Sequence, residues 1–168
     1  KFVEDTAFSK GVSPIVSYGG TPGTYFASDL SGVTESRIGV FVFGDLFQAN
    51  LGVCNVDEIA VSVLTRVIGV QDHNDRIIVD AGALALSHDR GTAGQSTDYG
   101  YGQVCDETEQ VFDGLVVTSV SQEHGIIDLS GSSFSCRDFK IGQSLRILPN
   151  HVCMTVASYD GFHVIEQN

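Results

Sequence analysis

Basic residues are scarce in this 168-residue chain, which has 9 Lys and Arg against 21 Asp and Glu and a formal net charge of −12. The basic residues are scattered along the sequence, whereas a nucleic-acid-binding protein needs a basic stripe to contact phosphates. Long apolar runs are also missing: no uncharged segment approaches the ~18 residues of a membrane span, and no basic-then-apolar segment of the signal-peptide kind opens the chain. We therefore expect neither nucleic acid nor a membrane among its partners.

The four cysteines, Cys54, Cys105, Cys136 and Cys153, include no CxxC pair, which argues against a zinc knuckle and a thioredoxin-like motif. Four cysteines in 168 residues are also far fewer than a small disulfide-rich secreted domain contains. We therefore expect reduced thiols and a cytoplasmic protein. Apolar residues make up 42% of the chain, which is enough for a packed core. The length predicts one domain, or one domain plus a fragment.

Short β-branched segments, separated by turn residues about every ten positions, predict a mainly β fold that forms an antiparallel barrel or sandwich. The expected strands span residues 38–43, 60–70, 76–80, 115–120, 126–129, 145–148, 152–156 and 163–165. The polar residues 71–75 between two of these strands predict a hairpin loop. Residues 81–110 are glycine-rich and irregular, and they predict one long loop that is either functional or a surface excursion.

The first 35 residues differ in kind from the rest. Residues 3–10 are typical of the end of a helix, with Gly11 as its stop. Residues 13–18 predict one buried strand that runs into a glycine loop, and a single strand without partners cannot make a core. We therefore expect residues 1–35 to be the closing piece of a larger α/β unit whose start is absent, and residues 36–168 to form a C-terminal β-domain.

His151 and Cys153 stand two positions apart in the segment Pro-Asn-His-Val-Cys. In a strand, residues i and i+2 point to the same face, so an imidazole and a thiol would lie side by side. This arrangement predicts a zinc site with two protein ligands, which would leave the other coordination positions for water or substrate. The alternative is a buried histidine and a buried cysteine that are neighbours by chance.

Two further patterns are weaker. Gly19, Gly20 and Thr21 follow the first expected strand and form a candidate phosphate-binding loop, because glycines let backbone N–H groups approach a phosphate and the threonine hydroxyl adds a donor. An ordinary turn is the alternative for this loop. Glu123 and His124 follow another expected strand and are candidate catalytic proton carriers or groups that support a metal ligand. A solvated polar turn is the alternative for that pair.

Taken in order, these pieces resemble one family. The motifs are Ser-Tyr-Gly-Gly-Thr-Pro at 17–22, Gly-Val-Phe-Val-Phe-Gly-Asp at 39–45, Val-Asp-Ala-Gly at 79–82 with Ala-Leu-Ser-His-Asp at 85–89, Tyr-Gly at 101–102, Glu-His-Gly at 123–125 and Pro-Asn-His-Val-Cys at 149–153. The chain resembles the C-terminal part of the D-serine dehydratase and D-threonine aldolase family, which are pyridoxal-phosphate enzymes of the alanine racemase fold. Each motif is short, but six in the same order cover nearly the whole chain.

The resemblance implies an N-terminal TIM-type barrel, mostly absent from this chain, whose site the β-domain completes. It implies that Tyr18 and residues 19–21 bind the phosphate of pyridoxal phosphate, in keeping with phosphate sites late in such barrels. The paired metal ligands of the family fall on His151 and Cys153. The cysteine resembles the zinc-dependent dehydratases, whereas aldolases more typically have an aspartate at that position.

The reaction that the resemblance implies is dehydration of a D-3-hydroxy amino acid substrate, above all D-serine to pyruvate and ammonia, with aldolase-type Cα–Cβ cleavage as the alternative. The Schiff-base lysine of the family has no counterpart here, because none of Lys1, Lys10 and Lys140 stands in its Pro-His-x-Lys setting. We therefore expect this chain alone to be inactive, and the resemblance implies a homodimer. A non-catalytic metal-binding or dimerisation β-domain is the competing hypothesis.

Overall fold

The structure, a computed structural model, describes residue 11 and residues 14–165. Contacts within the chain divide it into two compact units, Lys1–Val42 and Phe43–Asn168. The assignment of residues 1–35 and 36–168 as domains stays a prediction. The helix end expected at residues 3–10 lies outside the described residues.

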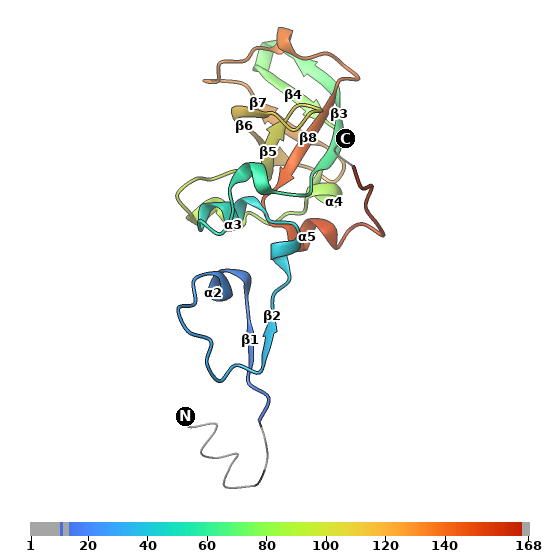
Figure 1. The fold of residues 1–168 in the computed structure, drawn as a ribbon. Coiled ribbons are helices and arrows are strands. Elements are labelled where there is room, and N and C mark those ends of the chain that lie inside the picture. Colours follow the sequence, from blue (N-terminus) through green and yellow to red (C-terminus); the bar gives the residue numbers. More distant parts are fainter. Residues whose placement is uncertain (1–10, 12–13, 166–168) are drawn as a thin grey trace. The chain divides into compact units, whose positions relative to one another are not determined.

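The second unit is a closed antiparallel barrel with the strand order β3–β4–β7–β6–β5–β8 (Figure 1). Its strand β8 closes the ring by pairing with both β3 and β5. The mainly β prediction, with an antiparallel barrel, is confirmed. The strands are β3 (Val63–Gln71), β4 (Arg76–Val79), β5 (Gly102–Cys105), β6 (Val111–Val120), β7 (Gly125–Asp128) and β8 (Ser144–Pro149).

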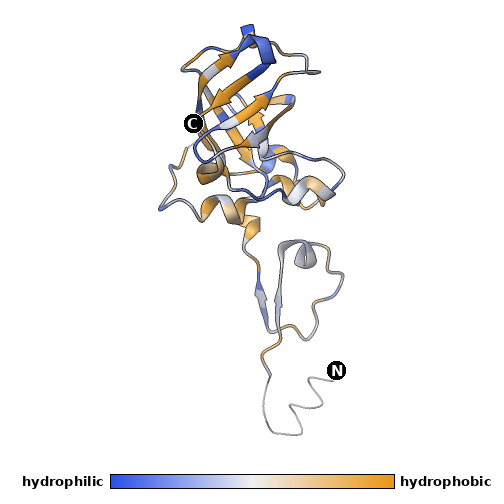
Figure 2. Ribbon diagram, turned by 180° about the vertical axis from the view of Figure 1, so that it is seen from behind, coloured by the Kyte–Doolittle hydropathy of each residue, from blue (hydrophilic) through white to orange (hydrophobic). Residues whose placement is uncertain are grey.

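Alternation along the strands builds the core of the barrel. In β3, Val63, Thr65 and Val67 are buried and the residues between them are exposed, and in β4 the buried residues are Ile77 and Val79. Figure 2 shows the strands as largely hydrophobic. Each fully buried aliphatic side chain stabilises the fold by about 1.5–3 kcal/mol. Other buried members of this core are Val104, Leu115, Val117, Ile127, Leu145 and Ile147.

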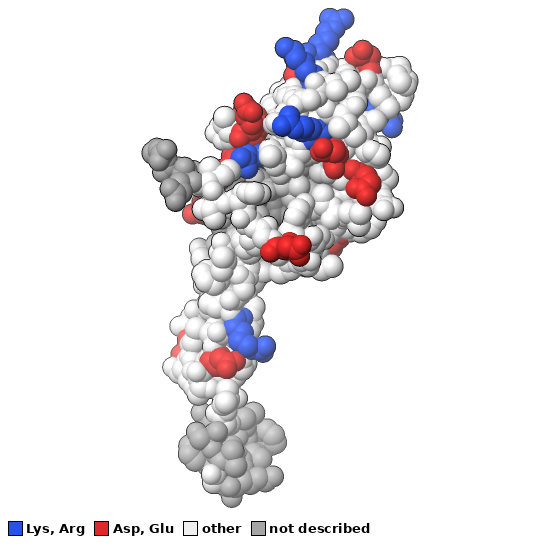
Figure 3. All heavy atoms as spheres, turned by 90° about the vertical axis from the view of Figure 1, so that its right-hand side faces the viewer, with Lys and Arg blue, Asp and Glu red and all other residues white. Residues whose placement is uncertain are grey.

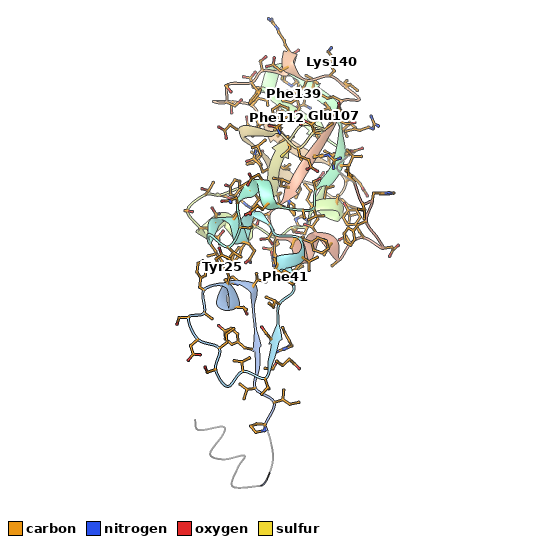
Figure 4. All side chains as sticks on the ribbon, in the orientation of Figure 1. Tyr25, Phe41, Glu107, Phe112, Phe139 and Lys140 are labelled. Carbon is orange, nitrogen blue, oxygen red and sulfur yellow. The ribbon has the colours of Figure 1, made fainter. Side chains whose placement is uncertain are left out.

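The two ends of the barrel differ. Phe112 packs edge to face against Phe134 and Phe139, with ring centroids 5.2 and 5.8 Å apart, and Figure 4 labels Phe112 and Phe139 toward one end. Three short helices lie at the other end (Figure 1). They are α3 (Leu46–Asn50), α4 (Ala83–Leu86) and α5 (Val152–Val156). The residues of the candidate site of this unit lie on and between these helices.

The surface of the barrel unit carries side chains of both charge signs, which are interspersed on the face shown in Figure 3. One such pair joins Arg146 on β8 to Glu109, with a nitrogen–oxygen distance of 3.6 Å. Within the part of the chain that the structure describes, no helix is both long and apolar enough to cross a membrane.

The strands predicted at 60–70, 76–80, 115–120, 126–129 and 145–148 are confirmed, with bounds that shift by a few residues. The hairpin loop predicted at 71–75 is also confirmed, because β3 and β4 pair in antiparallel register around it. A short 3-10 helix, η3 (Asp72–Asn74), lies in this loop.

Three predicted strands and the predicted long loop are wrong. Residues 38–43 contain a 3-10 helix, η1 (Val40–Val42), residues 152–156 form α5, and residues 163–165 contain no regular element. β-branched composition predicts a strand only where a partner strand can pair with it. Residues 81–110 contain α4, the 3-10 helix η4 (Gly91–Gly94) and the buried strand β5, whose four residues are too short a run to stand out among glycines.

The first unit contains β1 (Ser17–Gly19), α2 (Thr21–Tyr25) and β2 (Glu35–Arg37). The prediction of a lone buried strand at residues 13–18 is wrong, because β1 is short and exposed and pairs in parallel with the equally exposed β2. The polar sequence of β2 gives no strand signal, and side chains join the pair: Ser17 donates to Glu35 at 2.6 Å and Arg37 donates to Ser17 at 2.8 Å. Parallel strands are normally covered on both faces by other elements, whereas β1 and β2 are exposed in the described part of the chain.

Candidate functional site

The segment that holds His151 and Cys153 leaves the barrel and turns into a helix. Strand β8 ends at Pro149, His151 is the extended N-cap residue of α5, and Cys153 lies in its first turn. The prediction that the two residues share a strand face is therefore wrong. The carboxylate of Asp45 accepts the N–H of Val152, the first residue of the helix, at 2.9 Å and so stabilises the helix start. A local sequence pattern does not reveal this long-range contact.

Hydrogen bonds of Asn150 hold this segment against neighbouring parts of the barrel unit. Its side chain is 1% exposed, and its amide donates to the hydroxyl of Thr92 at 2.7 Å and to the carbonyl of Gly100 at 2.6 Å. Its Oδ1 accepts the Thr92 N–H at 3.2 Å, and its backbone carbonyl accepts the Phe47 N–H at 3.2 Å. The side chain of Asn150 thus joins the start of α5 to the loop before β5, and its backbone carbonyl joins the same point to α3. Sequence reasoning missed it because asparagine next to histidine gives no signal of its own.

The imidazole of His151 has a carboxylate partner. Its Nδ1 contacts Oδ2 of Asp89, and both side chains are about one-third exposed, at 35% and 34%. The ring of Phe47 stacks beside the imidazole, with centroids 6.3 Å apart and an interplanar angle of 30°. Because Asp89 engages Nδ1, Nε2 is the nitrogen left for a ligand. Asp89 ends the motif at residues 85–89, but nothing in the sequence predicts that it contacts His151.

The four cysteines differ in their accessibility. Cys153 is exposed, Cys54 is half-buried, and Cys105 and Cys136 are buried. Burial raises the pKa of Cys105 to about 11 and also raises the pKa of Cys54 and Cys136, so these three thiols ionise less readily than usual. Since the thiolate is the form that binds metal, Cys153 is the cysteine best placed to act as a ligand.

The donor set at α5 fits a borderline metal such as zinc, because it combines an imidazole nitrogen with an accessible thiol. Among the described residues, no group of three or more His, Cys, Asp or Glu is arranged as a metal site. His151 and Cys153 are therefore two donors at most within this chain, and a bound ion would take its remaining ligands from water, substrate or another segment.

Asp45 is a second carboxylate beside the pair. It is 0% exposed and accepts the N–H groups of Gln48 at 2.8 Å and Val152 at 2.9 Å. Burial raises its pKa, and these hydrogen bonds lower it only in part. Asp45 therefore fixes the backbone on which His151 and Cys153 stand, at a cost in desolvation.

Glu123 and His124 lie in the exposed turn between β6 and β7. The backbone of this turn accepts N–H groups from Ala83 and Leu84 of α4, at 2.8 and 3.1 Å. A Cβ on Gly82 would collide with residues 122–124, so glycine is needed for this close approach. The carbonyl of Leu86 in α4 in turn accepts a hydrogen bond from the Thr155 hydroxyl of α5 at 3.0 Å. The turn and helix α5 thus contact the same helix. In the described part of the chain, no hydrogen bond joins the side chains of Glu123 and His124 to those of His151 and Cys153.

His124 also lines a shallow hollow on the outer face of the barrel. Its volume is about 320 Å³, and its lining is almost wholly apolar. The other lining residues are Ile68, Ile78, Ser121 and Ile126. The hollow lies outside the closed ring of strands, and it offers one titratable group.

In the first unit, Tyr18, Gly19, Gly20 and Thr21 lie at the end of β1 and the start of α2. Gly20 has a φ of +104°, which favours glycine, and its N–H donates to the carbonyl of Arg37 at 3.2 Å. Thr21 is 6% exposed, and its hydroxyl has no hydrogen-bond partner among the described residues. An orphaned buried hydroxyl beside a glycine turn is compatible with a phosphate ligand.

A protein-family comparison finds that the family described as "Putative serine dehydratase domain" matches residues 60–165. The D-threo-3-hydroxyaspartate dehydratase of Delftia sp. is 48% identical over 155 residues, which are 90% of this chain and 41% of that enzyme. The D-serine dehydratase of Dictyostelium discoideum is 33% identical over 141 residues, which are 82% of this chain and 34% of that enzyme. The chain therefore spans less than half the length of these relatives.

Solved structures agree with the sequence relatives. An alanine racemase-like protein from Idiomarina loihiensis superposes with a TM-score of 0.88 and 45% identity, over 93% of this chain and 42% of that one. A structure of the Delftia dehydratase gives a TM-score of 0.86 with 48% identity, over 92% and 42%. That enzyme has also been solved with a histidine replaced by alanine and, in a metal-free form, with a cysteine two positions later replaced by alanine.

Proposed function

This chain belongs to the serine dehydratase domain family, and on that premise we propose that it forms the C-terminal part of a pyridoxal-phosphate- and metal-dependent lyase that dehydrates a D-3-hydroxy amino acid. The observation that carries the proposal is the His151–Cys153 pair, in which Asp89 occupies Nδ1 of the histidine and the thiol is exposed. Its order and spacing match those of the histidine and cysteine replaced in the Delftia enzyme.

In this proposal, Nε2 of His151 and the thiolate of Cys153 hold a zinc ion, and the helix start fixed by Asp45 keeps their backbones in place. Bound zinc supplies Lewis acidity toward an oxygen such as the β-hydroxyl of the substrate. The ring of Phe47 lies beside the imidazole, with the centroids 6.3 Å apart. Cys153 is exposed, so a zinc ion held there would be accessible to water or substrate.

Tyr18, Gly19, Gly20 and Thr21 bind the phosphate of the cofactor in this proposal, and the unpartnered hydroxyl of Thr21 is a donor to a phosphate oxygen. Bound pyridoxal phosphate supplies the electron withdrawal that makes the Cα–H bond acidic. The Schiff-base lysine comes from a segment outside this chain. Glu123 and His124 remain proposed proton carriers.

The overall change removes the Cα hydrogen and the Cβ hydroxyl as water, and the enamine that is released hydrolyses to a 2-keto acid and ammonia. D-serine gives pyruvate in this way. The stronger similarity to a D-threo-3-hydroxyaspartate dehydratase makes that substrate the first one to compare with D-serine. We further propose a homodimer, which rests on the family resemblance alone. We also propose a cytoplasmic location, in keeping with four free cysteines.

The test uses the intact protein that contains this chain. We expect 2-keto acid release from D-serine or D-threo-3-hydroxyaspartate, and we expect Cys153→Ala and His151→Ala to lose both bound zinc and most turnover while keeping the parent circular dichroism spectrum. Cys136→Ala is the matched control, because its thiol contacts the carbonyl of Arg76 on β4 and not the residues that hold α5, so this variant should retain zinc.

Equal zinc content in Cys153→Ala and the parent would refute the metal site. Cleavage of D-threonine to glycine and acetaldehyde, with no dehydration, would instead assign the aldolase reaction. If the intact protein binds zinc but does not bind pyridoxal phosphate, the competing hypothesis of a non-catalytic metal-binding domain would be supported instead.

A further inference from the structure

The contact between Asp89 and His151 depends on an energetically unfavourable backbone conformation at Ser87, two residues before Asp89. Asp89 lies just beyond α4, and the cap residue Ser87 has a φ of 78° and a ψ of 167°. This region of backbone conformation is essentially reserved for glycine, and serine adopts it at an energetic cost. The hydroxyl of Ser87 accepts the Asp89 N–H at 3.2 Å, which fixes the turn that brings the carboxylate to the imidazole.

The histidine is held from several sides as well. Asn150 before it is 1% exposed, the Val152 N–H after it is bonded to buried Asp45, and Phe47 stacks on its ring. These contacts fix the backbone on both sides of His151, whereas its imidazole is one-third exposed and can still rotate. The contact between Nδ1 and Oδ2 of Asp89 removes that freedom.

We propose that Asp89 is a positioning residue, which keeps the proton of neutral His151 on Nδ1 and so presents the Nε2 lone pair to a metal ion. This inference rests on the proposed metal role of His151 and Cys153. The carboxylate does not contact the metal or the substrate in this role. It acts through the histidine, by selecting one tautomer and one ring orientation.

The competing explanation is an ordinary surface ion pair. Side chains that are about one-third exposed gain little from pairing, and such a contact would affect stability slightly and metal binding not at all. A second ion pair of the same region provides the comparison, because Arg90 contacts Asp98, with side chains 39% and 43% exposed. Asp98→Asn weakens that pair and leaves His151 untouched.

The experiment measures zinc affinity by chelator competition in the intact protein, for the parent, Asp89→Ala, Asp89→Asn and the control Asp98→Asn. We expect both Asp89 variants to bind zinc about 10- to 100-fold more weakly, as is typical when the carboxylate behind a metal-bound histidine is lost. The asparagine keeps the shape, but its NH₂ group can donate to Nδ1 and force the proton onto Nε2. We expect Asp98→Asn to bind like the parent.

A second measurement does not depend on metal. Nitrogen-15 NMR of the metal-free protein reports which ring nitrogen carries the proton, and His151→Ala identifies the signals that belong to this histidine. We expect the Nδ1–H form in the parent and the Nε2–H form in Asp89→Asn.

The outcomes separate the two proposals. Parent-like zinc affinity in both Asp89 variants, or an Nε2–H tautomer in the parent, would overturn the role of Asp89 and leave the His–Cys metal site intact. A similar loss in Asp98→Asn would also overturn it, because general loosening of the loop would then explain the effect. A parent protein without zinc affinity would overturn the proposed metal site itself.

Discussion

Replacing Asn150 with alanine tests how strongly one buried amide holds the site end of the barrel. The side chain makes three hydrogen bonds, to the Thr92 hydroxyl, the Thr92 N–H and the Gly100 carbonyl. Each hydrogen bond contributes about 0.5–1.5 kcal/mol net, and a buried group left without a partner costs about 1–3 kcal/mol. Thr92 is 0% exposed, so water does not readily replace the lost partner. We expect Asn150→Ala to lower the free energy of unfolding by about 3 kcal/mol.

The assay is urea denaturation of the intact protein followed by circular dichroism, with the free energy extrapolated to zero urea. The matched control is Asn50→Ala. The half-buried amide of Asn50, at the end of α3, also joins distant segments, since it donates to Gln95 at 2.9 Å and to the Thr97 carbonyl at 2.7 Å, but water can reach these groups. We expect the control to cost about 1 kcal/mol or less. Equal losses in the two variants would refute the argument that burial makes Asn150 special.

Two predictions concern protonation and thiols. Burial raises the pKa of Asp45, so the native state binds the carboxyl proton more tightly than the unfolded state does. The free energy of unfolding of the parent, compared with that of Asp45→Asn, should therefore be greatest at acid pH. The difference should fall as the pH rises through the raised pKa. Urea denaturation across pH checks this, and a difference that grows with pH would contradict it. The exposed Cys153 should react first with a thiol reagent such as DTNB, and added zinc should slow that reaction. Cys105, with a pKa of about 11, should react only on unfolding, and its reaction in the native protein would speak against its burial.

The barrel is largely predictable from the sequence because its strands carry their own local signals. Residues of β4 and β7 alternate between buried and half-buried, and the turn residues between strands mark where each one ends. Strand β5 was not predictable, because Gly102–Cys105 is fully buried and too short to alternate visibly.

The candidate site was only half predictable, for a physical reason. His151 and Cys153 stand out by residue type, but the first N–H of α5 is bonded to Asp45, which is more than a hundred positions away. The valines and threonine of α5 favour a strand by local propensity, and this distant hydrogen bond stabilises the helix against that preference. Asp89 and Asn150 likewise act across distant segments, so their roles appear only once the chain is folded.

The closed ring of strands has a consequence for the order in which the molecule assembles. Strand β8 is the last of the six in the sequence and the one that joins β3 to β5, so the ring stays open until β8 docks. Contacts between segments so distant along the chain form slowly, because a long loop must be closed first. Pro149 ends β8, and His151 and Cys153 follow at once. The pair therefore follows directly on the strand that closes the ring, and loss of the β8 pairing would also separate His151 from Asp89 and the start of α5 from Asp45.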